Sequence, residues 1–340
     1  MKKKVLITGM SGFIGAHVAE GVLKNTDWDV VGLDRYGKSG MASRIMDMDR
    51  WEEFKSRTEL HWHDLRSPIS GLAAHGIGDD ITHVFHLAAS SHVDRSIESP
   101  MDFVMDNVVG TCNILDWARR LPNLEQFIYF STDEVFGPAP QGVNYKEWDR
   151  YKSANPYAAT KAGGEELALA YQNTYQMPVV ITHTMNVFGE RQHPEKFIPL
   201  CIKKSLVGSK ISVHANKDCT ESGTRFYIHA RNVAAALVFL AKSKHVTIGD
   251  KYNIVGEKEV SNLDMAKFIH SIVSENVPVP PANVELVDFH SSRPGHDLRY
   301  ALDGTKLHSM GFDYPKNFEE SLRKTIEWTL RNRKWLMMAE

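Results

Sequence analysis

The segment VLITGMSGFIGAHVAEGVLK, residues 5–24, decides the fold. It joins a short apolar run directly to a helical pattern that starts at Ile14 and ends near Lys24. Gly9, Gly12 and Gly15 mark the turn, where glycines let the backbone approach a pyrophosphate and a helix start offers unpaired N–H groups. The segment predicts a strand, a dinucleotide-binding turn and a helix. Its G-x-x-G-x-x-G spacing is a variant fingerprint, which tight strand–helix packing alone could also explain.

Five further apolar runs repeat this alternation of strand and helix. They are DVVGLD from residue 29, ELHWHDL from 59, ITHVFHLAA from 81, QFIYFST from 126 and PVVITHT from 178. Strands that are apolar on both faces and separated by helical patterns are typical of a parallel sheet covered on both sides. We therefore predict an α/β fold with a doubly wound parallel sheet, a Rossmann domain, over residues 1–186.

The strand–helix alternation weakens after about residue 186. A polar, glycine-containing stretch occupies residues 214–226 and a proline-rich stretch occupies residues 277–283. We predict a smaller mixed α/β domain over residues 187–340 that binds the substrate, with a segment near 225–255 returning to the first domain.

Composition excludes several classes of protein. The 340 residues are 42% hydrophobic and 24% charged, and 40 basic against 42 acidic side chains leave a net charge of −2, so neither a nucleic-acid nor a membrane partner is indicated. Cys112, Cys201 and Cys219 are too far apart for a paired zinc pattern, and the histidines of HWH at 61–63 are the only close pair. We expect a cytoplasmic protein with reduced cysteines and no metal site.

A carboxylate follows the second strand. Asp34 lies 19 residues after Gly15, where it can accept hydrogen bonds from the adenosine ribose diol, which favours NAD over a cofactor with a 2′-phosphate. Arg35 follows directly and leaves that choice open, and Asp34 could also be a turn residue that caps the strand. Asp64 and Leu65 end the third strand, where they would meet the adenine.

A second pattern lies in the helical stretch at 157–175. Tyr157 and Lys161 are four residues apart and share one helix face, with Asn155 and Pro156 just before them as helix-start residues. A tyrosine has a pKa of about 10, and a nearby ammonium favours its phenolate. The pair therefore suits a base for hydride transfer, although a chance Tyr and Lys on one helix is also common.

The fifth strand, in FIYFSTDEVFG at 127–137, ends in Thr132 and two adjacent acids, Asp133 and Glu134. Such a strand end is either an ordinary polar loop or a site that handles two protons. Two neighbouring carboxylates are expected to differ in pKa, because ionising one disfavours ionising the other.

Together with HLAA at 86–89, these features resemble the extended short-chain dehydrogenase/reductase family that acts on nucleotide sugars, over nearly the whole chain. STDEVFG at 131–137, SSHVDRSI at 90–97, PEKFIPL at 194–200 and RPGHDLRYALD at 293–303 are most similar to its dTDP-glucose 4,6-dehydratase branch. The resemblance implies an NAD-dependent lyase that removes water from a nucleoside-diphosphate hexose through a 4-keto intermediate. It also implies a homodimer that packs the helices at 101–120 and 157–175 against a twofold copy, although from the sequence alone those helix faces could equally well only cover the sheet.

The resemblance assigns roles to individual residues. Tyr157, beside Lys161 and hydrogen-bonded by Thr132, would take the proton of the hexose 4-hydroxyl, after which Glu134 would remove the C5 proton and protonated Asp133 would donate to the departing 6-hydroxyl. The implied cofactor-binding residues are Gly9, Gly12, Phe13, Ile14, Gly15, Asp34, Asp64, Leu65, Leu87, Ala88, Ala89, Asn107, Ser131, Tyr157, Lys161 and Asn186. The implied substrate-binding residues are Ser91, His92, Thr132, Asn186, Lys196, Arg225, Arg293 and His296.

Three departures from the family leave the substrate open. Ser90 stands where a glutamate is usual, Val187 stands where a second asparagine is usual, and FYIHARN at 226–232 replaces acidic residues. A 5,6-dehydratase acting on UDP-N-acetylglucosamine therefore stays an alternative. A sugar 4-epimerase needs no acid pair, a UDP-glucuronate decarboxylase typically carries only the glutamate, and an NAD-sensing regulator would lack Tyr157 or Lys161.

Overall fold

The computed structural model describes residues 2–37, 40–288 and 298–338. Its main feature is a seven-stranded parallel sheet in the order β10-β6-β5-β4-β1-β2-β3. The strands are β1 Lys4–Thr8, β2 Asp29–Asp34, β3 Thr58–Trp62, β4 His83–His86, β5 Gln126–Thr132, β6 Val179–Thr184 and β10 Lys251–Ile254. The predicted fold class is confirmed, since the six expected strands are present and β10 adds a seventh beside β6.

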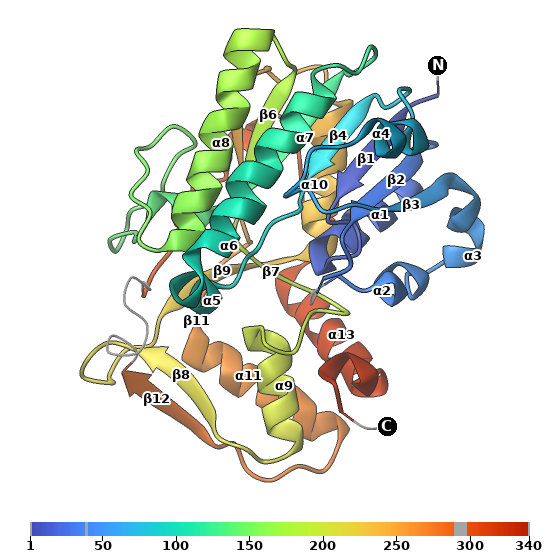
Figure 1. Cartoon of the computed structure of the whole chain (residues 1–340). Helices are drawn as coiled ribbons and strands as arrows, with labels where there is room; N and C mark the ends of the chain where they lie inside the picture. The colour runs from blue at the N-terminus through green and yellow to red at the C-terminus, as the bar shows by residue number, and fades with distance from the viewer. Residues whose placement is uncertain (1, 38–39, 289–297, 339–340) are drawn as a thin grey trace.

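Helices cover both faces of the sheet because successive strand residues point in opposite directions. Val5 and Ile7 of β1 join one apolar core with α1 (Phe13–Asn25) and α10 (Ala230–Lys242). Leu6 joins the other core with α4 (Gly71–Ile77), α7 (Gly110–Ala118) and α8 (Pro156–Tyr175). Figure 1 shows the green helices α7 and α8 side by side across the sheet.

The helix expected at 101–120 is interrupted by a wider turn. It runs as α6 (Pro100–Val104), a π turn at Met105–Val109, and α7. Such turns insert one extra residue per turn and are frequent at functional sites. This one places Asp106 and Asn107 beneath the loop that follows β4, since Ser90 hydrogen-bonds to both of them.

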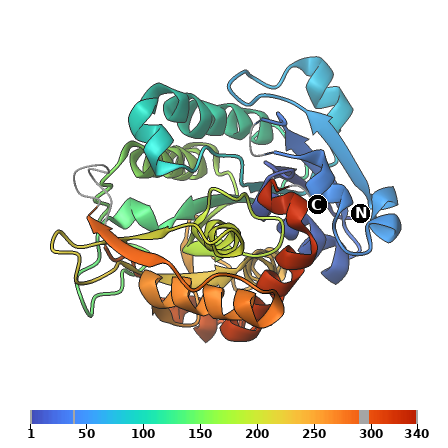
Figure 2. The ribbon, with the colours of Figure 1, turned by 90° about the horizontal axis from the view of Figure 1, so that it is seen from below.

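The chain after β6 builds a smaller unit with its own core. β7 (Asn186–Phe188), β9 (Thr224–His229) and β11 (Glu259–Ser261) form one sheet, and β8 (Ile211–Ala215) pairs with β12 (Val284–Asp288). The helices α9 (Phe197–Leu206), α11 (Asn262–Asn276) and α13 (Phe318–Arg331) pack with them around a third core, and Figure 2 shows this unit from below. Because α10 and β10 rejoin the large sheet, the chain crosses between the units more than once; the domain boundary at 186/187 stays a prediction.

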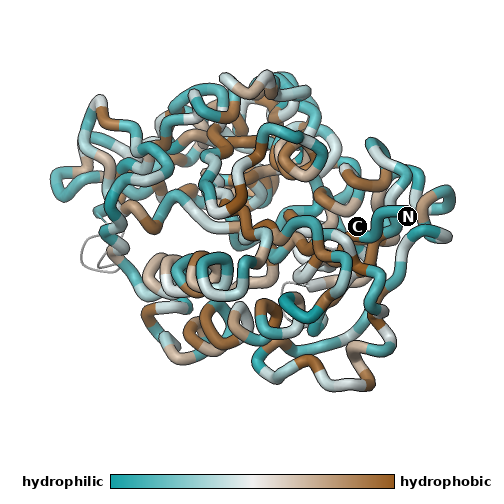
Figure 3. The backbone as a smooth tube through the Cα atoms, turned by 90° about the horizontal axis from the view of Figure 1, so that it is seen from above, coloured by the Kyte–Doolittle hydropathy of each residue, from teal (hydrophilic) through white to brown (hydrophobic). Residues whose placement is uncertain are grey.

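Short elements complete the described chain. They are the helices α2 Ala42–Met46, α3 Trp51–Phe54, α5 Val93–Glu98 and α12 Thr305–Ser309, with 3-10 turns at Lys55–Arg57, Asp133–Phe136 and Arg333–Leu336. Figure 3 shows hydrophobic stretches passing through the interior while hydrophilic stretches follow the outer loops. Across the ranges described, no helix combines the length and the hydropathy that crossing a membrane requires.

Candidate active site

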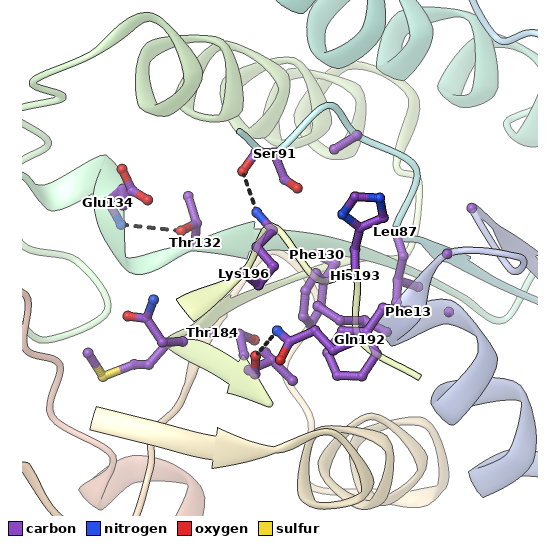
Figure 4. Close-up of a pocket in the computed structure, with 18 of the residues that line it drawn as sticks. Phe13, Leu87, Ser91, Phe130, Thr132, Glu134, Thr184, Gln192, His193 and Lys196 are labelled. Carbon is purple, nitrogen blue, oxygen red and sulfur yellow. Dashed lines mark hydrogen bonds between the residues drawn. The ribbon is translucent and has the colours of Figure 1, made fainter. Parts of the chain in front are cut away.

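Parallel strands end at one common edge of the sheet, and ligands of such folds bind there. Two adjoining cavities lie at this edge, of about 320 and about 420 Å³, with Gly9, Gly12 and Leu87 in the walls of both. The smaller cavity is lined by the predicted catalytic residues, and the larger one by Asp34, Asp64 and Leu65. Figure 4 shows the smaller cavity, with Glu134 and Thr132 at one end and Leu87 and Phe13 at the other.

The turn between β1 and α1 is shaped for close approach of a ligand. Gly9 has a φ of +70°, which favours glycine, and a Cβ on Gly15 would lie 2.2 Å from the Gly9 carbonyl oxygen. Gly12 is the N-cap of α1 and offers no side-chain cap, so the first N–H groups of this 13-residue helix are left at the cavity wall. These groups fit a pyrophosphate, as the glycine spacing predicts.

Asp34 ends β2 in the wall of the larger cavity. Its carboxylate accepts hydrogen bonds from the backbone N–H groups of Ser11 and Tyr36, each at 2.9 Å. The next residue, Arg35, forms a two-pronged ion pair with Asp106 at 2.7 and 2.8 Å. Asp34 is therefore held at the end of β2, where its carboxylate could bind a ribose diol, and it also caps the turn.

Asp133 and Glu134 open the 3-10 turn directly after β5. The Thr132 hydroxyl donates to Asp133 Oδ1 at 3.0 Å and accepts from the Glu134 N–H at 3.4 Å (Figure 4). Asn155 Nδ2 donates to Glu134 Oε2 at 3.0 Å. Asp133 is buried, and its Oδ2 has no hydrogen-bond partner among the described residues.

The electrostatics separate the two acids. Burial, and then the charge of Glu134, raise the pKa of Asp133 to about 7, against weaker opposing effects of Thr132 and Arg225. A buried carboxyl with an unpartnered oxygen is most stable when it carries a proton. Asp133 therefore keeps its proton in an appreciable fraction of molecules at neutral pH, next to Glu134, and the two-proton role of the strand end stays a prediction.

Tyr157 and Lys161 lie on the first two turns of α8. Burial, followed by the charge of Glu134, raises the pKa of Tyr157, while a hydrogen bond with Thr132 opposes this. Lys161 Nζ donates to the Phe130 carbonyl at 2.7 Å and lies 4.3 Å from the Tyr129 ring centroid, and burial lowers its pKa to about 7. Burial, and then the charges of Glu134 and Asp133, thus outweigh the lowering of the Tyr157 pKa that the ammonium was expected to cause.

Asn155 connects helix α8 to the acid pair. Its Oδ1 caps the helix by accepting from the Ala158 N–H at 2.9 Å, while its Nδ2 holds Glu134. We expect Asn155→Ala to lower the free energy of unfolding by about 1 kcal/mol, because an N-cap is lost, and to slow turnover. Thermal unfolding and initial rates measure the two effects. Asn155→Ser keeps an N-cap but lacks the amide donor, so it should restore the stability but not the rate. Wild-type rates in both variants would mean that Asn155 only caps the helix and has no part in turnover.

Most of the predicted site residues do meet at these cavities. The smaller cavity is lined by Gly9, Gly12, Phe13, Ile14, Gly15, Leu87, Ala89, Ser91, Ser131, Thr132, Asp133, Glu134, Tyr157, Lys161, Asn186 and Lys196, and the larger one adds Asp34, Asp64, Leu65, Ala88 and His92. Lys196 Nζ donates to the Ser91 carbonyl at 3.3 Å (Figure 4). The Ser131 hydroxyl is buried with no hydrogen-bond partner in the described parts of the chain, which leaves it able to bind a ligand.

Among the predicted residues that the structure describes, Asn107 and Arg225 are not in the cavity walls. Asn107 lies behind Ser90, where its side chain holds the Ser90 backbone N–H and carbonyl at 2.8 and 3.0 Å. Arg225 is buried and donates to the carbonyls of Thr224 and Leu298. Arg293 and His296 lie outside the described residues. The roles predicted for all four stay predictions.

Other wall residues carried no recognisable signal in the sequence. Thr184 ends β6 next to Thr132, and its hydroxyl has no hydrogen-bond partner within residues 2–37, 40–288 and 298–338. Gln192, His193 and Glu195 come from the loop after β7. A polar residue at the end of a predicted strand could have indicated Thr184, whereas the loop residues follow no such rule. Within the described residues no cluster of three or more His, Cys, Asp or Glu could hold a metal ion.

Known proteins resemble this chain over almost its whole length. The family model described as GDP-mannose 4,6 dehydratase matches residues 6–325. A dTDP-glucose 4,6-dehydratase of Escherichia coli is 34% identical, with 98% of this chain and 95% of that protein covered. The structure of DesIV, a dTDP-glucose 4,6-dehydratase of Streptomyces venezuelae solved with NAD and TYD bound, has a TM-score of 0.84 at 30% identity and covers 98% of both chains. A UDP-glucuronic acid 4-epimerase of Bacillus cereus has the same TM-score at 25% identity, with 97% and 99% covered.

Proposed function

The chain belongs to the family described as GDP-mannose 4,6 dehydratase and is an NAD-dependent nucleotide-sugar dehydratase, and from this premise we propose how its residues remove water from a nucleoside-diphosphate hexose. The observation that carries the proposal is the acid pair: a buried Asp133 that keeps its proton near neutral pH, next to Glu134 and within reach of Tyr157. An elimination needs one acid and one base at the same substrate, and this pair supplies both.

The chain's own residues fit NAD. The glycine turn and the start of α1 suit the pyrophosphate, Asp34 suits the ribose diol, and the unpartnered hydroxyl of Ser131 faces the catalytic end. When bound, NAD supplies the acceptor for the hydride on C4 of the hexose and the donor that returns a hydride to C6.

Oxidation of the hexose begins at Tyr157. The Tyr157 phenolate accepts the proton of the 4-hydroxyl as the C4–H bond breaks, and Thr132 orients the phenolate and the hydroxyl by hydrogen bonding. Lys161 lies one helical turn further along α8, buried and held by the Phe130 carbonyl. We propose that its ammonium supports the phenolate once the ligands fill the cavity, because a positive charge nearby favours the ionised tyrosine.

Elimination then follows at C5 and C6. The new ketone acidifies the C5 proton, which the Glu134 carboxylate removes, while Asp133 donates its proton to the 6-hydroxyl as the C6–O bond breaks and water leaves. A hydride at C6 and a proton at C5 saturate the double bond and give a 4-keto-6-deoxyhexose. The net change is the loss of one water, and Asn155 holds Glu134 in place through its amide.

The raised pKa of Asp133 predicts an alkaline limb in the rate profile. The acid form is present below its pKa of about 7 and is lost above it, so kcat/KM for water loss should fall about tenfold per pH unit on the alkaline side. Initial rates from about pH 6 to pH 9 measure this. Asp133→Asn should be slow at every pH and lack the limb that depends on this carboxyl. An unchanged alkaline limb in that variant would remove Asp133 from the role of acid.

We propose dTDP-glucose as the first substrate to test, because relatives such as the Escherichia coli enzyme carry that name. Two departures lie in the cavity walls: Val187 lines the smaller cavity without an amide side chain, and Ser90 donates to Asp106 in the larger one. The test compares dTDP-glucose, UDP-glucose, CDP-glucose, GDP-mannose and UDP-N-acetylglucosamine by mass spectrometry. If one of these substrates loses one water, it identifies the nucleotide that the enzyme uses. If none of them loses water, the proposal that the enzyme dehydrates these hexoses is wrong.

Assembly and location are further proposals. Met101 of α6 and Tyr175 of α8 are apolar side chains exposed by 66% and 50%, on the two helical stretches that the predicted dimer would pair. We propose a homodimer through these helices, which gel filtration at several protein concentrations would test. The balanced charge supports the proposal of a cytoplasmic enzyme.

A further inference from the structure

Four side chains form a charged cluster in the wall of the larger cavity, and the reaction described above does not use it. This Asp106 cluster consists of Arg35, Arg66, Ser90 and Asp106. The carboxylate of Asp106, only 7% exposed, accepts hydrogen bonds from Arg35 Nη1 and Nη2 at 2.7 and 2.8 Å, from Arg66 Nε at 2.6 Å and from Ser90 Oγ at 2.5 Å. One carboxylate therefore binds two arginines at the end of the cavity where Asp34 lies.

The position of Arg35 makes the Asp106 cluster relevant to cofactor binding. Arg35 directly follows Asp34, whose carboxylate is fixed by two backbone N–H groups at the position proposed for the ribose diol. A guanidinium at this point is suited to a ribose 2′-phosphate, because its planar fork binds two oxygens of one anion. In this chain the same fork is already filled by both oxygens of Asp106.

The charges in the cluster are compensated. Burial raises the pKa of Asp106, but the hydrogen bonds from Arg66, Arg35 and Ser90 outweigh it and leave the pKa below the ordinary value, so the group is ionised at neutral pH. Arg66 Nη2 also reaches Asp102 at 3.3 Å, and Arg35 Nη1 lies 3.7 Å from Asp64. A phosphate that bound Arg35 in place of Asp106 would leave the largely buried Asp106 carboxylate with fewer partners, which is unfavourable.

We propose that Asp106 is a positioning residue that selects NAD over NADP by binding Arg35 and Arg66 within the cavity wall, where they cannot bind a 2′-phosphate. The inference rests on the proposed cofactor site and adds a determinant that lies 72 residues after Asp34 and 91 residues after Gly15 in the sequence. Removing the negative charge of Asp106 should release a guanidinium next to the ribose edge.

The test measures which dinucleotide is bound rather than activity. Full-length protein is equilibrated with equal concentrations of NAD and NADP, separated from free nucleotide, and the bound NADP/NAD ratio is read by mass spectrometry. Asp106→Asn should raise this ratio about tenfold or more, as expected for one gained hydrogen bond between charged groups. Adding Arg35→Met to that variant should abolish the gain. Asp116→Asn is the matched control, because it removes a carboxylate that also binds two arginines, Arg119 and Arg120, but lies outside the walls of both cavities; it should leave the ratio unchanged.

Two results would overturn the proposal. One is an unchanged ratio in Asp106→Asn that still binds NAD. The other comes from Arg35→Met alone, which keeps Asp106 in place: the proposal predicts no change, and a tenfold fall would mean that Arg35 already binds the phosphate. Failure of the wild type to bind either dinucleotide would reject the cofactor site and this inference together, whereas NAD binding without sugar dehydration counts against the proposed function alone.

Discussion

Glu134→Gln is expected to abolish water loss while leaving the protein folded and able to bind its ligands. Glutamine keeps the size of the side chain and can still hydrogen-bond Asn155, but it cannot remove the C5 proton. General-base catalysis is worth about 100- to 10,000-fold, so the dehydration rate should fall by that factor. The rate of water loss from the best substrate, measured by mass spectrometry, gives the result.

A glutamate at the other end of strand β5 provides the control for Glu134→Gln. Glu125 lies just before β5, half-exposed and paired with Lys3, whereas Glu134 lies just after it in the cavity wall. Glu125→Gln should keep the wild-type rate. A Glu134→Gln variant with wild-type water loss would show that another group removes the C5 proton, and the acid pair would no longer explain the activity.

Tyr157→Phe is the second variant with a large expected effect. It removes only the phenol oxygen, so the ring still packs against Phe103, with the ring centroids 6.4 Å apart, while the 4-hydroxyl loses its proton acceptor. Because the ketone must form before the C5 proton becomes acidic, both oxidation and water loss should fall, by about 100- to 10,000-fold. Glu134→Gln and Tyr157→Phe should therefore differ: the first still lets the 4-keto sugar form, and the second does not.

A second tyrosine of the same helix serves as the reference. Tyr175 lies at the C-terminal end of α8 and is half-exposed, so Tyr175→Phe should turn over like the wild type. Spectroscopic detection of reduced cofactor in a single turnover separates the variants. Formation of the 4-keto sugar at the wild-type rate in Tyr157→Phe would transfer the role of base to another group.

The parallel sheet was predictable because five of its six expected strands are mostly buried on both faces. The run ELHWHDL differs, since it forms β3, an edge strand with no buried residue, and only the surrounding alternation of strands and helices indicates it. The run KYNI of β10 was not identified as a strand, because it is short, begins with lysine and includes an asparagine; Lys251 instead reaches Tyr151 and Glu165 in the interior. Local hydrophobicity cannot reveal such long-range partners.

The acid pair and the Tyr–Lys pair were predictable because their spacing is local. Asp133 and Glu134 directly follow the end of β5, and Tyr157 and Lys161 share one helix face. The surroundings that set their chemistry come from distant segments: Asn155 holds Glu134 across 21 residues, and the Phe130 carbonyl holds Lys161 across 31. For that reason only the structure shows in which direction the pKa of Tyr157 is shifted.

The Asp106 cluster shows the same limit for the cofactor. Sequence position alone left Arg35 as an argument for a 2′-phosphate, and its bidentate partner lies 71 residues away on a π turn. Only the fold shows that the arginine is already engaged. Roles that depend on Arg293 and His296 stay predictions from the resemblance.

The most direct test of the account is a short incubation of the enzyme with dTDP-glucose in deuterated water, followed by mass spectrometry and NMR of the sugar. Removal of the C5 proton by Glu134 and later protonation of C5 predict a product that has lost one water and carries one solvent-derived deuterium on C5. A product with the mass of the substrate would instead indicate epimerisation. Water loss that leaves a double bond at C5, with no deuterium there, would indicate 5,6-elimination and contradict the proposed 4,6-dehydration.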